Sequence, residues 1–144
     1  MKTNTKLMQW ANIAAFVATI VVNTLASTVG LFGARTGDLS DGIANLFVPA
    51  GLTFSVWGVI YLLLLGFTVA QARGLFSADR QAPEALARVG WLFFVTSVAN
   101  IAWLLLWHGR LVGLSMIPML VLLVTLAAIH VRLGTGRTRP TGAE

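Results

Sequence analysis

Four long apolar stretches dominate this sequence, and each is about as long as a lipid bilayer is thick. They occupy approximately residues 7–31, 50–72, 87–107 and 111–133. A helix rises about 1.5 Å per residue, so roughly 20 apolar residues cross the ~30 Å hydrocarbon core. Spanning strands would instead give ~10-residue alternating segments, which the sequence does not show. Because a helix satisfies its own backbone hydrogen bonds in lipid, the sequence predicts an all-α integral membrane bundle of four transmembrane helices.

The composition also indicates that lipid surrounds most of the chain. Of the 144 residues, 57% are hydrophobic and 10% are charged, whereas soluble domains carry about 25% charged residues. A soluble fold of this size could not bury so much apolar surface in one core. The sequence has no cysteine, which excludes disulfides and thiolate chemistry. We expect a single transmembrane domain over residues 1–133 and a polar, flexible tail over residues 134–144.

Loops and charges predict the topology. Polar, turn-rich segments at residues 33–45 and 73–83 separate the first three helices, and a tight turn at residues 107–110 should make the last two helices antiparallel neighbours. The loops on one side carry only Arg35 and Arg110. The other side carries Lys2, Lys6, Arg73, Arg80, Arg88, Arg132, Arg137 and Arg139. Because cytoplasmic loops are rich in Lys and Arg, both termini are expected in the cytoplasm of a multi-pass protein. The first apolar run exceeds the ~7–15 residues of a signal-peptide core, so it is expected to remain as a helix.

Polar residues in the first helix fall on one narrow face. Asn12, Thr19 and Asn23 are spaced seven and four residues apart, which places them on one side of a helix. One interpretation is that this face forms interhelical hydrogen bonds, as polar residues in membrane helices commonly do. The other is that Asn12 or Asn23 lines a ligand cavity.

The second helix carries two adjacent faces. Small residues form one face, and it comprises Gly51, Ser55, Gly58 and Gly66. Aromatic residues dominate the other, which comprises Phe54, Trp57, Tyr61 and Thr68. The small face allows another helix to approach closely. The aromatic face is either packed in the bundle or exposed to lipid, or it forms a flat wall for a planar apolar ligand.

The third helix repeats the aromatic pattern. Asn100, Trp103 and Trp107 share one face, and Asn100 lies near the middle of the span, where a lone amide needs a hydrogen-bond partner. Trp107 could equally anchor the helix at the interface. His108 and His130 are each isolated, so no metal site is expected.

These residues together resemble the tryptophan-rich sensory protein family, which includes TspO and the translocator proteins. The second helix reads Phe47-Val48-Pro49, Phe54-Ser55-Val56-Trp57 and then Tyr61, and the third reads Asn100-Ile101-Ala102-Trp103. The stretch from residue 35 to residue 61 looks like a bacterial branch of the family. Relatives have a fifth helix, which this chain is expected to lack. The resemblance therefore implies a TspO-like bundle in a bacterial cell membrane.

The resemblance also implies a ligand and a site. Members bind porphyrins, haem-related tetrapyrroles or sterol-like lipids beneath the first loop. Carried over to this sequence, the binding residues would be Pro49, Phe54, Trp57, Tyr61, Asn100, Trp103 and Trp107. The expected partners are membrane lipid, such a ligand and, as one option, a second copy of the chain in a homodimer; nucleic acid is not among them. No cofactor is required, although a porphyrin or haem-like molecule could be bound.

Three functions follow from these observations. The leading one is a membrane-embedded sensor, receptor or carrier for tetrapyrroles or sterol-like ligands. The alternatives are a small four-helix transporter and a structural or assembly subunit that packs through its small-residue face. Ion-coupled transport needs an ionisable group within the membrane. No apolar stretch holds Asp, Glu, Lys or Arg in its middle, which counts against the transporter. No nucleophile–base pair or paired carboxylates indicate an enzyme, and porphyrin degradation rests on the resemblance alone.

Overall fold

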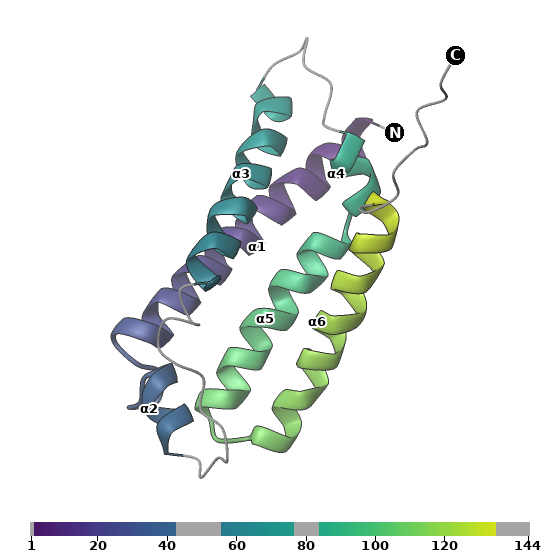
Figure 1. Ribbon diagram of the computed structural model, residues 1–144. Coiled ribbons are helices and arrows are strands. Elements are labelled where there is room, and N and C mark those ends of the chain that lie inside the picture. The colour runs from purple at the N-terminus through teal and green to yellow at the C-terminus, as the bar shows by residue number, and fades with distance from the viewer. Residues whose placement is uncertain (1, 43–55, 77–83, 135–144) are drawn as a thin grey trace, which may run out of the picture.

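The computed structural model describes residues 2–42, 56–76 and 84–134, and these form helices joined by short turns. No strand occurs within those ranges. The helices are α1 (Lys2–Thr28), α2 (Thr36–Asp41), α3 (Val56–Phe76), α4 (Glu84–Val89), α5 (Leu92–His108) and α6 (Val112–Leu133). Figure 1 shows α1, α3, α5 and α6 as the long elements, with α2 and α4 as short helices at the ends of the bundle.

Three of the long helices are long and apolar enough to cross a membrane. Their spanning segments are Thr5–Thr28, Val56–Phe76 and Val112–Leu133, with mean hydropathies of 1.5, 1.7 and 2.5. The fourth, α5, is an apolar helix of 17 residues. The chain is therefore an all-α membrane bundle, which confirms the predicted fold class.

The third apolar stretch differs from the single helix expected over residues 87–107. It divides into α4 and α5 at Gly90, whose φ of +55° is left-handed and incompatible with a continuing α-helix. The first loop also contains a helix that the sequence analysis did not predict, α2. It begins after Arg35, whose backbone N–H donates to the Asp38 carboxylate in a capping arrangement. The second apolar stretch was expected to begin at residue 50, and that start lies outside the described residues.

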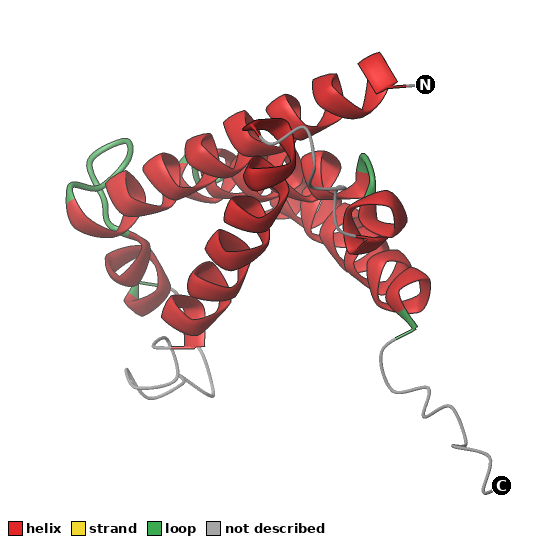
Figure 2. Cartoon of the chain, turned by 90° about the horizontal axis from the view of Figure 1, so that it is seen from above, coloured by secondary structure: helices red, strands yellow, loops and turns green. Residues whose placement is uncertain are grey.

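The long helices pack around α1 and α5. α5 packs on α6, as expected from the tight turn between them, and α1 packs on both α5 and α3. In that turn the Leu111 N–H donates to the Leu106 carbonyl over 2.9 Å. α3 and α6 do not pack closely on each other, and Figure 2 shows them diverging like the arms of a V.

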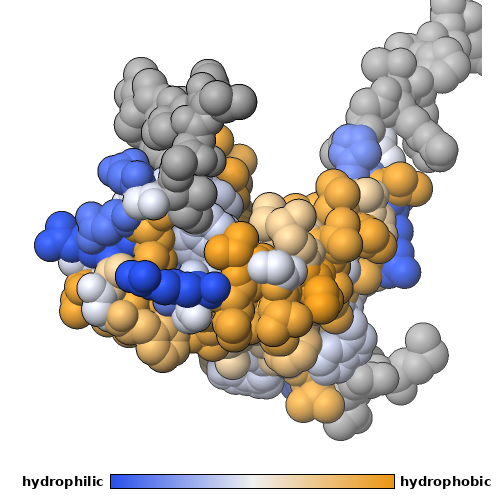
Figure 3. Space-filling view, turned by 90° about the horizontal axis from the view of Figure 1, so that it is seen from below, coloured by the Kyte–Doolittle hydropathy of each residue, from blue (hydrophilic) through white to orange (hydrophobic). Residues whose placement is uncertain are grey.

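The apolar core is small and lies where five helices meet. Phe16 of α1, Val89 of α4 and Phe93 of α5 are buried, and Phe67 of α3 and Ile129 of α6 pack against them. The rings of Phe67 and Phe93 are 5.1 Å apart between centroids. Many other apolar side chains face outward, as the orange areas of Figure 3 show. In a bilayer these side chains contact lipid tails, so their exposure costs nothing.

A buried amide cluster joins α1 to α3 and to the α4–α5 turn. The Gln9 side chain donates to the Gln71 carbonyl over 3.2 Å. Asn12 donates to the Gln71 side-chain oxygen over 3.5 Å and to the Gly90 carbonyl over 3.4 Å. Asn12 and Gln71 are both fully buried. The polar face of α1 therefore forms interhelical hydrogen bonds at this end of the bundle.

Candidate functional site

A pair of asparagine side chains connects α1 and α5 near the middle of the bundle. Asn23 Nδ2 donates to Asn100 Oδ1 over 2.8 Å and to the Thr19 carbonyl over 2.8 Å. One turn earlier in α1, the Thr19 hydroxyl donates to the Ala15 carbonyl over 2.8 Å, and its oxygen lies 3.4 Å from the Ser97 carbonyl of α5. Asn23 and Asn100 are half-buried. Asn23 therefore forms an interhelical hydrogen bond, which is the first of the two interpretations given for the polar face of α1.

The asparagine pair orients the Asn100 amide. Because Asn100 Oδ1 accepts from α1, its Nδ2 group must point away from that contact. This leaves two N–H donors on a half-buried side chain within an apolar bundle. Asn100 can thus serve as a structural residue through its oxygen and as a ligand donor through its nitrogen.

Two tryptophans follow Asn100 on the same face of α5. The rings of Trp103 and Trp107 are stacked, with centroids 6.4 Å apart and an interplanar angle of 28°. Trp103 Nε1 is buried and has no hydrogen-bond partner among the described residues. An unpaired buried donor is costly, and such groups in native proteins usually have a reason. A ligand oxygen or nitrogen would satisfy it.

A second aromatic pair lies on α3. The rings of Trp57 and Tyr61 have centroids 6.1 Å apart at an interplanar angle of 30°. The same face of α3 carries Thr68, which is buried, so this face points toward the bundle. Trp57 is 42% exposed, as expected for a residue at the edge of the packed region. Within the described part of the chain, no ring contact joins this pair to Trp103 and Trp107.

The seven predicted binding residues thus fall into three groups. Trp57 and Tyr61 form one pair on α3, and Asn100, Trp103 and Trp107 form a row on α5. Pro49 and Phe54 lie outside the described residues. The two aromatic groups belong to helices that both pack on α1.

One polar contact at this site was not foreseen from the sequence. His108 is 2% exposed and bonded, although the sequence suggested an isolated residue. Its Nδ1 lies 2.9 Å from the Leu104 carbonyl, and its Nε2 lies 3.3 Å from the Thr36 hydroxyl. A carbonyl only accepts, so Nδ1–H donates to Leu104, and in a neutral ring Nε2 accepts from the threonine hydroxyl. This bond attaches α2 of the first loop to the end of α5, directly beside Trp107.

The charged groups lie at the ends of the helices rather than along this site. Arg88 and Glu84 form an exposed salt bridge within α4, with Nη2 and Oε1 2.6 Å apart. Among the described residues, no group of three His, Asp or Glu side chains could hold a metal ion. The site therefore offers aromatic faces and neutral donors, which suit an apolar molecule with a few polar atoms.

Apolar spanning helices, a neutral polar interior and paired aromatic side chains define a multi-pass integral membrane protein. Comparison with protein families agrees, because the model of a family described as TSPO-like protein matches residues 9–142. The chain belongs to this family. Membership indicates a membrane ligand-binding or transport protein. No curated protein and no solved structure gave a significant match.

Proposed function

We propose that the protein binds a flat, largely apolar molecule between the aromatic faces of α3 and α5. The ligand class is a tetrapyrrole, such as a porphyrin or haem-related molecule, or a sterol-like lipid. Trp57 and Tyr61 provide one wall, and Trp103 and Trp107 provide the other. Burying flat apolar surface gives about 25 cal/mol per Å², and stacking on aromatic rings adds roughly 0.5–1.5 kcal/mol each.

The unpaired Trp103 Nε1 is the observation that carries this proposal. The donor is buried, and the Asn100 amide lies one turn away on the same face of α5. A ligand acceptor, such as a carboxylate, carbonyl or hydroxyl oxygen, would pair with either group. Two neutral donors on an aromatic wall favour a planar molecule with acceptor atoms at its edge over a purely hydrocarbon ligand.

The role proposed for this site is sensing or carrying the ligand, as a receptor does, rather than transforming it. The two donors proposed to meet the ligand, Trp103 Nε1 and the Asn100 amide, are neutral groups that bind a ligand without exchanging protons with it. The same proposal places the protein in a bacterial cell membrane with both termini in the cytoplasm, in agreement with the distribution of Lys and Arg over its loops.

The test is a titration of the detergent-purified protein with protoporphyrin, followed by the shift of the porphyrin absorption band. A Trp57→Leu, Trp103→Leu double variant is expected to bind roughly tenfold or more weakly, because two stacking walls are lost. The matched control is Trp10→Leu, Trp91→Leu, which also removes two indoles. Trp10 and Trp91 are 52% and 43% exposed and pair instead with Phe76 and Phe94. Equal affinity in the two double variants would refute the site, and displacement of porphyrin by a sterol would show that both ligands share it.

An assembly role has one observation in its favour. Gly58 and Gly66 are exposed on α3, and a methyl group added at either would meet no atom within 4 Å. This small-residue face is therefore not used for packing among the described residues, and it could accept a helix of another subunit or of a second copy. Native mass measurement in mild detergent distinguishes a homodimer or larger complex from a self-contained binder.

A further inference from the structure

A hollow lies between α5 and α6, on the opposite side of α5 from the candidate site. It has a volume of about 460 Å³. Its α5 residues include Val98 and Ala102, which are two positions from Asn100 and so lie on the opposite helix face. None of the seven predicted binding residues lines it. This groove is therefore separate from the aromatic walls described above.

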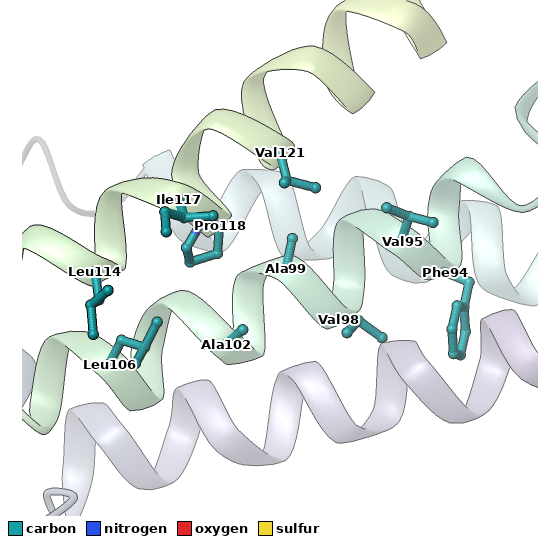
Figure 4. A pocket seen from close by; sticks show the side chains of 10 residues that line it. All are labelled: Phe94, Val95, Val98, Ala99, Ala102, Leu106, Leu114, Ile117, Pro118 and Val121. Carbon is teal, nitrogen blue, oxygen red and sulfur yellow. The ribbon is translucent and has the colours of Figure 1, made fainter. Parts of the chain in front are cut away.

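Small residues form the floor of the groove, and bulky ones form its rim. Figure 4 shows Ala99 and Ala102 on α5 facing Pro118 on α6, with Phe94 at one end and Leu106 at the other. From Phe94 to Leu106 the helix rises by about 18 Å. One leaflet of the hydrocarbon core is about 15 Å thick, which is half of the ~30 Å total. The groove thus matches the length of one lipid tail.

The chemistry of the lining distinguishes between occupants. Every residue that lines the groove is apolar. A tetrapyrrole or sterol would place its polar atoms there without partners, which is unfavourable. Membrane helix partners prefer small residues that let backbones approach, whereas bulky side chains such as Phe94 and Ile117 border this groove. A hydrocarbon tail has no polar atom and is narrow enough to lie between two helices.

A cationic residue, Arg110, lies in the turn that follows one end of the groove. The α5–α6 turn follows the lining residue Leu106, whose carbonyl accepts a hydrogen bond from Leu111 N–H. Arg110 is exposed in that turn and has a left-handed φ of +59°. A guanidinium at the membrane edge binds phosphate through paired N–H donors. We propose that the groove binds one acyl chain of a phospholipid whose phosphate is bound by Arg110.

The experiment is native mass spectrometry of the full chain in detergent with added phosphatidylglycerol. One lipid per chain is expected for the wild type. Arg110→Gln should weaken retention about tenfold, because a charge-assisted hydrogen bond is lost, and Ala102→Phe should weaken it similarly by filling the groove. The control is Leu123→Phe, a matched enlargement at a 65% exposed position of α6 that does not line the groove.

Arg110 is exposed, so its variant tests the proposal even where Ala102→Phe fails to fold. Wild-type lipid retention in Arg110→Gln would overturn the proposal. So would an Ala102→Phe protein that loses a dimer but keeps its lipid, because the groove would then be an interface between copies. Porphyrin binding should be unchanged in both variants, which separates this site from the proposed function. A loss of porphyrin affinity in folded Ala102→Phe protein would assign the groove to that ligand instead.

Discussion

Removing either member of the Asn23–Asn100 pair should destabilise the bundle unequally. In Asn100→Leu, the Asn23 amide loses one of its two bonds but keeps the other, to the Thr19 carbonyl, so the nitrogen remains partly satisfied and the cost is about 1 kcal/mol. In Asn23→Leu, Asn100 Oδ1 loses its partner on α1, and an unsatisfied acceptor costs about 1–3 kcal/mol. We therefore expect Asn23→Leu to be the more destabilising change. The near-equal size of Leu and Asn limits packing effects.

A double-mutant cycle measures the bond itself. The wild type, both single variants and the double variant are unfolded from detergent micelles by titration with a denaturing detergent. The coupling free energy should fall between about 0.6 and 1.7 kcal/mol, the average and upper values for interhelical hydrogen bonds in membranes. Thr28→Val serves as a control, because the Thr28 hydroxyl donates only to the Thr24 carbonyl within α1.

Two results would contradict this reasoning. A coupling below about 0.3 kcal/mol, within the additivity of independent sites, would mean that the two amides do not act as a pair. A greater loss of stability in Asn100→Leu than in Asn23→Leu would mean that Asn100 makes contacts more important than the one to Asn23.

Two further predictions concern the first loop. Gly30 has a φ of +91° and an added methyl group would lie 2.8 Å from a backbone oxygen, whereas Gly33 has a φ of +84° with open space around it. Gly30→Ala should therefore lower the free energy of unfolding by about 1 kcal/mol more than Gly33→Ala, because Gly33→Ala suffers only the strain of the left-handed backbone. Equal losses of stability in the two variants would show that the contact at Gly30 relaxes freely. Thr36→Val removes the hydroxyl bonded to His108, so backbone amides at residues 36–41 should exchange with deuterium several-fold faster, while those of α6 stay unchanged. Exchange at residues 36–41 as slow as in the wild type would contradict an anchoring role for this bond.

The sequence predicted the helical bundle well because membrane spans follow from length and hydropathy. The adjacency of α5 and α6 also followed, since only a short turn joins them. Polar spacing identified the face of α1 that carries Asn12, Thr19 and Asn23. What it could not supply was the partner of each residue. Asn23 and Asn100 are 77 positions apart, and either residue could have paired with several others on spacing alone.

The breaks and the small loop elements were harder to predict. Gly90 sits in an apolar stretch, and one glycine does not reveal that it takes a left-handed φ and divides α4 from α5. His108 appeared isolated because its partner Thr36 lies 72 residues earlier, in a loop whose short helix has no apolar periodicity. At the site, aromatic spacing placed Trp57 with Tyr61 and Trp103 with Trp107, but not the distance between the two pairs.

The polar face of α1 has a consequence for the order in which the protein assembles. Its side chains bond to Gln71 and Asn100, which are synthesised 59 to 77 residues later. α1 also has the lowest mean hydropathy of the three long spans, 1.5 against 1.7 and 2.5. On entering the membrane first, it has amides that nothing yet satisfies. α1 therefore reaches its final state only after the third apolar stretch has been inserted, long after α1 itself has entered the membrane.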